Sequence, residues 1–110
     1  MPPSDSLAKN EALFREVNER IEAVSQSVPP GYEAMEFLCE CDRRDCRENV
    51  NLTRTEYEAV RAVSTHFIVL PSHQDPRIEH IAFANERFLV VEKEGKAARR
   101  AEESDPRDQT

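Results

Sequence analysis

The chain has 110 residues, of which 38% are apolar and 34% charged, and its formal net charge is −7 at pH 7. This length allows one small domain with a thin core, which needs a further stabilising device such as a bound metal. The acidic balance argues against sequence-independent binding to a nucleic-acid backbone and favours a neutral or cationic protein partner.

The N-terminus has no basic segment followed by an apolar core, and no apolar run is long enough to span a bilayer. An odd number of cysteines without a secretory signal is typical of a reducing compartment. We therefore expect a cytoplasmic protein with no membrane contact, and the pattern favours no particular oligomeric state.

The first predicted element is an amphipathic helix within residues 1–28. Apolar residues recur at spacings of three and four or their sums, namely Leu7, Phe14, Val17, Ile21 and Val24. Because this stripe is narrow, the helix either packs on its own domain, which is the favoured interpretation, or pairs with a helix of a partner. A Pro-Pro-Gly sequence then predicts a hinge at residues 29–34.

Residues 35–93 are predicted to form an α+β domain that begins with a hairpin of strands at 35–39 and 49–52. Thr53 and Glu56 have the spacing of a capping box, which predicts the start of a helix. The buried face of this helix would carry Tyr57, Val60 and Val63, and the helix should end by Thr65.

The second half of the domain is predicted to be mainly strands. The apolar runs at 67–70 and 88–91 are typical of buried strands. Residues 77–83 fit a helix or a strand, and the turn that follows favours a strand. Residues 94–110 are charged and poor in apolar residues, which predicts a disordered tail. The predicted fold is α+β, with a long N-terminal amphipathic helix followed by a small zinc-stapled β-sheet domain with one short helix.

Three cysteines lie within eight residues, as Cys39, Cys41 and Cys46, and the chain has no others. Side chains two apart in an extended segment point to the same face, so the first two thiols can share one ion. The polar turn between Cys41 and Cys46 can return the third thiol to the same place. Such a trio indicates three ligands of a tetrahedral metal site, and the leading metal is Zn²⁺.

The fourth ligand must come from elsewhere, and His73 is the candidate because it follows an apolar run and a proline. A Cys3His set is an ordinary structural zinc site. His66 and His80 compete for this position. The alternatives to a metal site are three unrelated thiols, or a redox pair with one spare thiol.

The acidic residues beside the thiols, Glu40, Asp42 and Asp45, are expected to be solvated. No phosphate-binding glycine loop or catalytic set is apparent, so we expect no catalytic residues and no enzyme activity. Arg43 and Arg44 are the one feature that could touch nucleic acid, but the flanking aspartates offset their charge, which makes nucleic-acid binding an unfavoured hypothesis.

Several motifs outside the tail form one set: E-F-L-C-E-C at 36–41, Cys46, L-T and E-Y within 52–57, P-S-H at 71–73 and V-V-E-K at 90–93. With this set the chain resembles a family of short uncharacterised bacterial proteins. The resemblance implies that the three cysteines and the histidine after the proline belong together, which supports His73 as the fourth ligand. It carries no known activity. The family tends to have glycine where this chain has Ser72.

These observations lead to three hypotheses about function. The first is a structural Cys3His zinc domain that acts as a protein-interaction or regulatory module, with a contact surface on the first helix or the zinc loop, that is Phe14, Val17, Ile21, Arg43 and Arg44. The second is a redox sensor in which oxidation of the thiols releases the metal. The third is a metal-dependent hydrolase, which would need an open coordination position, or a nucleic-acid-binding protein similar to a zinc knuckle.

Overall fold

The computed structural model describes residues 3–24, 34–41 and 46–108, with side chains from residue 12 onward. Its elements, in chain order, are α1 (Pro3–Val24), β1 (Ala34–Leu38), β2 (Asn49–Thr53), α2 (Arg54–Arg61), β3 (His66–Val69), β4 (Glu79–Ala84), β5 (Leu89–Lys93), α3 (Gly95–Glu103) and a 3-10 turn (Pro106–Asp108). This is an α+β fold, as predicted. The hinge expected at 29–34 falls outside the described residues except for Ala34.

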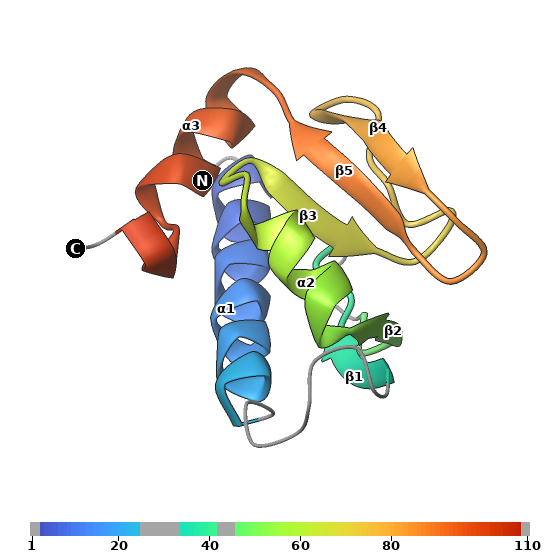
Figure 1. Ribbon diagram of the computed structural model, residues 1–110. Helices are drawn as coiled ribbons and strands as arrows, with labels where there is room; N and C mark the ends of the chain where they lie inside the picture. The colour runs from blue at the N-terminus through green and yellow to red at the C-terminus, as the bar shows by residue number, and fades with distance from the viewer. Residues whose placement is uncertain (1–2, 25–33, 42–45, 109–110) are drawn as a thin grey trace.

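The strands form two antiparallel sheets. One is the hairpin β1–β2, and the other has the order β3-β5-β4. Figure 1 shows β5 between β3 and β4, with β4 at the outer edge of the molecule. The predicted strands at 35–39, 49–52, 67–70 and 88–91 are confirmed within one or two residues, and the ambiguous segment 77–83 forms strand β4 from residue 79 onward.

The second helix begins where the sequence predicts. The hydroxyl of Thr53 accepts a hydrogen bond from the backbone N–H of Glu56, and the Glu56 carboxylate accepts one from the N–H of Thr53, which completes the capping box. Tyr57 and Val60 are buried, but the expectation for Val63 was wrong because α2 ends at Arg61 and Val63 is 41% exposed. The third buried residue of α2 is Arg61 instead of Val63.

Helix α1 packs against its own domain over the part whose side chains are described. Phe14 is buried, and the partly buried Ile21 packs against the core of the same domain. Val17 is half-buried. The predicted contact surface on this helix is therefore corrected: its apolar stripe is used within the domain, because so thin a core needs that face. Val24, at the end of the stripe, is exposed.

The predicted disordered tail and the single short helix are also corrected. Gly95–Glu103 forms helix α3, which begins at Gly95 with φ 58° and buries Ala101. The segment has few large apolar residues, but alanine is the best helix former and needs little space where a helix packs. The chain then turns so that Asp105 is 2% exposed and accepts a hydrogen bond from the Arg61 guanidinium. The buried ion pair between Arg61 and Asp105 holds the C-terminal segment against the domain.

A group of charged side chains joins α1, α2 and the C-terminal segment, and we call it the ion-pair cluster; its members are Arg15, Glu19, Arg61, Asp105 and Arg107. The Arg15 guanidinium also donates to the backbone oxygens of Ser64, His66 and Ala101 and stacks 4.0 Å from the ring centre of Phe67. The cluster therefore ties the first helix to the sheet and to the tail.

Candidate metal centre

The first two thiols lie directly after strand β1. The N–H of Cys39 donates to the oxygen of Glu48 at 3.0 Å, so the hairpin pairing continues one step beyond the strand. The N–H of Glu40 donates to the oxygen of Ile68 at 2.7 Å, which attaches the same segment to β3. The segment from Cys39 to Cys41 is thus held between the two sheets, and both thiols are 1% exposed.

The other two side chains come from neighbouring loops. Cys46 lies three residues before β2 and is 8% exposed. His73 lies in the loop between β3 and β4, where its N–H donates to the oxygen of Leu70 at 2.9 Å. This tight turn requires φ 77° at Ser72, a region that glycine adopts without strain. The backbone here has the conformation that a glycine at this position would favour.

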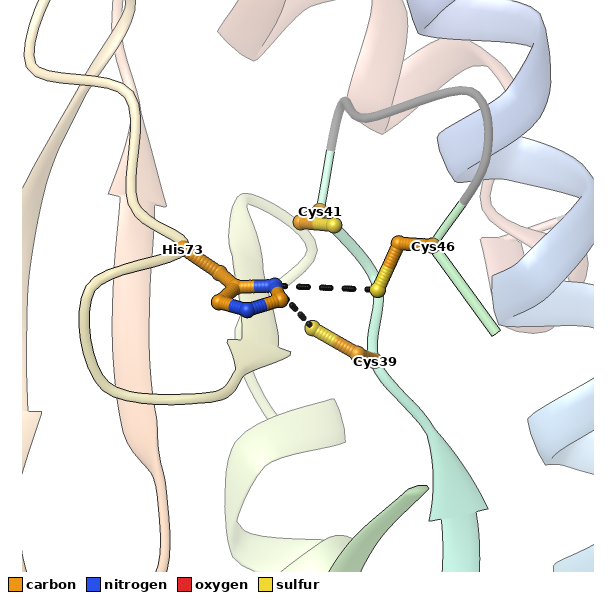
Figure 2. A group of neighbouring side chains, drawn as sticks. All are labelled: Cys39, Cys41, Cys46 and His73. Carbon is orange, nitrogen blue, oxygen red and sulfur yellow. Dashed lines mark hydrogen bonds between the residues drawn. The ribbon is translucent and has the colours of Figure 1, made fainter. Parts of the chain in front are cut away.

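The structure brings the four predicted ligands together. One ligand atom from each of Cys39, Cys41, Cys46 and His73 lies within 4.8 Å of the others. Figure 2 shows the imidazole of His73 facing the sulfurs of Cys39 and Cys46, and its Nδ1 atom is 3.6 Å from each of them. The three cysteines form no disulfide. A set of three sulfurs and one nitrogen of this kind can hold a metal ion.

The surroundings of the thiols favour the neutral form when no cation is present. The hydrogen bond with Cys41, together with burial, raises the pKa of the Cys39 thiol, and burial raises the pKa of the Cys46 thiol. The backbone N–H of Leu70 points to the sulfur of Cys39 at 3.3 Å and opposes this effect. Three adjacent thiolates would repel one another, so a bound cation is what would allow them to coexist.

Glu40 differs from the expectation of a solvated carboxylate. It is 1% exposed, and its carboxylate accepts hydrogen bonds from the side-chain amide of Asn18 at 2.8 Å and from the N–H of Ile68 at 3.0 Å. Burial raises the pKa of Glu40, while the nearby Arg15 charge opposes the rise. Alternation could have indicated this role, because the middle residue of C-x-C must point away from the sulfurs.

Asn18 on helix α1 is the residue that the sequence analysis missed. Its side chain accepts from the N–H of Leu38 at 2.7 Å and donates to the oxygen of Leu38 at 2.9 Å, besides its bond to Glu40. A polar residue beside an apolar helical stripe is usually solvated, so no signal in the sequence pointed to it. It connects α1 directly to the segment that carries the first two thiols.

The remaining predicted residues lie elsewhere. His66 and His80 lie on either side of Glu92 across the three-stranded sheet, with their Nε2 atoms 3.6 and 3.5 Å from its carboxylate. Neither belongs to the group of ligand atoms found among the described residues. Arg43, Arg44, Asp42 and Asp45 fall outside the part of the chain that the structure describes.

Comparison with protein-family models, with curated proteins and with solved structures found no match for this chain. The resemblance to a bacterial family therefore remains a prediction. No helix among the described residues is long and apolar enough to cross a membrane.

Proposed function

We propose that the chain is a small zinc-binding domain in which Cys39, Cys41, Cys46 and His73 hold one Zn²⁺ ion with a structural role. The observation that carries the proposal is the convergence of three buried thiols and one imidazole from three separate segments. Sulfur and imidazole nitrogen are the ligands that zinc takes in structural sites.

The distances between the ligand atoms support a four-coordinate ion of this size. With Zn–S bonds of about 2.3 Å and a Zn–N bond of about 2.0–2.1 Å, tetrahedral geometry puts sulfur and nitrogen about 3.6 Å apart. The two distances from the Nδ1 atom of His73, to Cys39 and to Cys46, are both 3.6 Å. The whole set of ligand atoms lies within 4.8 Å, against about 3.8 Å for two sulfurs bound to one zinc, so the set would contract by up to about 1 Å to take up the ion. A thiolate-rich set disfavours magnesium and calcium.

A structural role fits better than a catalytic one. Four protein ligands complete the coordination of zinc, whereas catalytic sites keep a position for water or substrate. The three sulfurs are also buried, which keeps substrates away from them. We therefore propose that the protein is not an enzyme.

The ion would supply folding energy that the thin core lacks. It would join the β1–β2 hairpin to the loop after β3. These two parts are distant in sequence, since 34 residues separate Cys39 from His73. Because such a site does not exist in the unfolded chain, the free energy of metal binding becomes free energy of folding.

We further propose that the domain serves as a protein-interaction module. Two features support this role: the net charge of −7 and the exposed apolar side chains of strand β4, Ile81 and Phe83. Redox sensing by the thiols is less favoured, because oxidants reach exposed thiolates of low pKa most readily and these thiols are buried. Binding to nucleic acid is disfavoured by the same net charge.

The test is the metal content of protein purified without chelator, measured by elemental analysis, with native mass and circular dichroism before and after a strong chelator. We expect one zinc per chain and loss of folded structure when it is removed. Metal-free protein that is folded and has three titratable thiols would overturn the proposal.

The three histidines provide matched variants. We expect His73→Ala to lose zinc, because it removes a ligand, while His66→Ala and His80→Ala keep full zinc content because their imidazoles face Glu92 instead. Equal zinc content in all three variants would show that His73 is not a ligand.

A further inference from the structure

Strand β4 is an exposed apolar strand at a sheet edge. It pairs with β5 on one side, and the order β3-β5-β4 leaves its other side at the edge of the sheet. All residues from His80 to Ala84 are exposed, including Ile81 at 47% and Phe83 at 54%. An exposed edge with large apolar side chains is a template for pairing with another strand.

A cavity of about 260 Å³ opens beside this edge, on the face of the sheet that α2 covers. Its lining is mainly apolar and consists of Glu56, Ala59, Val60, His66, Ala82, Phe83, Phe88 and Val90. Two of these residues, Ala82 and Phe83, belong to the edge strand itself. A strand added to β4 would therefore bring one row of its side chains to the mouth of the cavity.

Two exposed carboxylates, those of Glu92 and Glu94, lie beside β4, where both contact His80. Glu92 is 40% exposed and lies opposite His80 in the register of the sheet, and Glu94 lies 2.6 Å from the Nδ1 atom of His80 and is 53% exposed. The guanidinium of Arg87 is bound by Glu56 at 2.6 Å, so its charge is already compensated. The chain as a whole carries a net charge of −7. These groups favour a basic occupant.

We propose that β4 binds an extended, basic segment of a protein partner, which adds to the sheet as a strand beside β4. Main-chain hydrogen bonds would supply part of the affinity, an apolar side chain would fill the cavity beside Phe83, and lysine or arginine side chains would face Glu92 and Glu94. This inference rests on the proposed interaction role and names its surface and the chemistry of its partner.

A second copy of the chain is a poorer occupant of the same edge. Two copies would each bring a charge of −7, and this repulsion opposes pairing of one acidic edge with another. The proposal therefore commits to a partner of opposite charge, and self-association becomes an outcome of the test.

The test uses full-length, zinc-loaded protein and two synthetic peptides of equal length. One alternates lysine with valine and phenylalanine, and the other has glutamate in place of each lysine. We expect the lysine peptide to bind about tenfold or more tightly than the glutamate peptide in calorimetry, to bind more weakly at high salt, and to protect the β4 amides from hydrogen exchange.

Two variants locate the binding site. Phe83→Ser should weaken binding of the lysine peptide about tenfold, whereas Val63→Ser should leave it unchanged, since Val63 is exposed but does not line the cavity. Both variants should keep the zinc content of the wild type. A variant that loses zinc would show a defect of the proposed metal centre. A variant that loses peptide binding at full zinc content would show that β4 is the binding site.

Three results would overturn the inference. They are absence of binding by the lysine peptide, equal binding of the two peptides, and a dimer in sedimentation that Phe83→Ser dissociates. The last result would mean that a second copy occupies the edge.

Discussion

The metal centre and the ion-pair cluster stabilise neighbouring parts of one small domain by different means. The candidate metal centre gathers thiols whose pKa values are raised, by the hydrogen bond with Cys41 and burial at Cys39, and by burial at Cys46, so on the proposed function its stability would depend on an ion from solution. The ion-pair cluster takes its opposite charges from the chain itself, because Asp105 accepts from Arg61 and Glu19 contacts both Arg61 and Arg107. Two polar anchors thus support a domain whose apolar core is thin, and only one of them should respond to a chelator.

Loss of a ligand should have the largest effect. Cys46→Ser removes one sulfur from the metal centre and should lower zinc content and stability together, by about 5 kcal/mol or more, which can unfold a domain of this size. Thermal unfolding and elemental analysis of the same sample measure both effects. As a control, a chelator should destabilise the wild type and leave the variant unchanged. A variant that keeps its metal and melts like the wild type would contradict the site.

Breaking the ion-pair cluster should be the next largest effect and should spare the metal. Asp105→Ala removes one of the two carboxylates that contact the buried Arg61 guanidinium and leaves only Glu19, which we expect to cost about 3 kcal/mol in the free energy of unfolding. Denaturant titration measures this cost. Glu103→Ala on the exposed face of α3 is the control and should change little. A variant that loses zinc in proportion to stability would show that the two anchors are not separate.

The pH dependence of the same variant provides a second measurement. Burial alone would raise the pKa of Asp105, but hydrogen bonds from Arg61 and from the backbone of Arg107, with the charges of Arg61 and Arg15, together hold it below its ordinary value. A carboxylate with a lower pKa in the folded chain stabilises it above about pH 4, and this contribution is lost as the pH falls further. The difference in the free energy of unfolding between wild type and Asp105→Ala should therefore shrink in acid. Any effect of pH on the metal centre is common to both proteins and does not enter this difference.

Asn18 connects helix α1, which also carries Arg15 and Glu19 of the ion-pair cluster, to the segment with Cys39 and Cys41, so its removal should lower both stability and zinc affinity. Asn18→Ala leaves the N–H of Leu38 and the carboxylate of Glu40 without their amide partner, which should cost about 2 kcal/mol. Zinc affinity should fall as well, because these bonds hold the segment that carries Cys39 and Cys41. A competitive chelator titration measures the affinity, and the exposed Arg20→Ala is the control on the same helix. Unchanged affinity would mean that α1 does not position the ligands.

The smallest effect should come from the turn before His73. Ser72 has φ 77°, which a β-branched side chain tolerates poorly, so Ser72→Val should cost about 1–2 kcal/mol. Ser72→Gly should be tolerated, as glycine adopts this conformation freely. Thermal unfolding of the two variants compares them directly. Equal stability of both would indicate that the backbone of this turn is not constrained.

The sequence predicted the metal centre better than the ion-pair cluster because of the chemistry of the residues involved. Cysteine is rare in this chain, and three thiols at so short a spacing indicate a shared metal ion more directly than any other arrangement. Arginine and aspartate are common surface residues, so nothing distinguished Arg15 or Asp105 from their solvated neighbours. The disordered tail was wrongly predicted for the same reason, since the burial of Asp105 depends on the charge of Arg61, which a distant helix supplies.

By itself the sequence determined the local elements: the capping box at Thr53, the alternation of the strands and the set of candidate metal ligands, all of which depend on neighbouring residues or on rare side chains. Only the tertiary structure decided which polar side chains are buried, because the burial of Glu40, Asn18 and Asp105 depends on partners that distant segments supply. It also left β4 exposed at the edge of its sheet, although the same apolar residues would suit a buried strand.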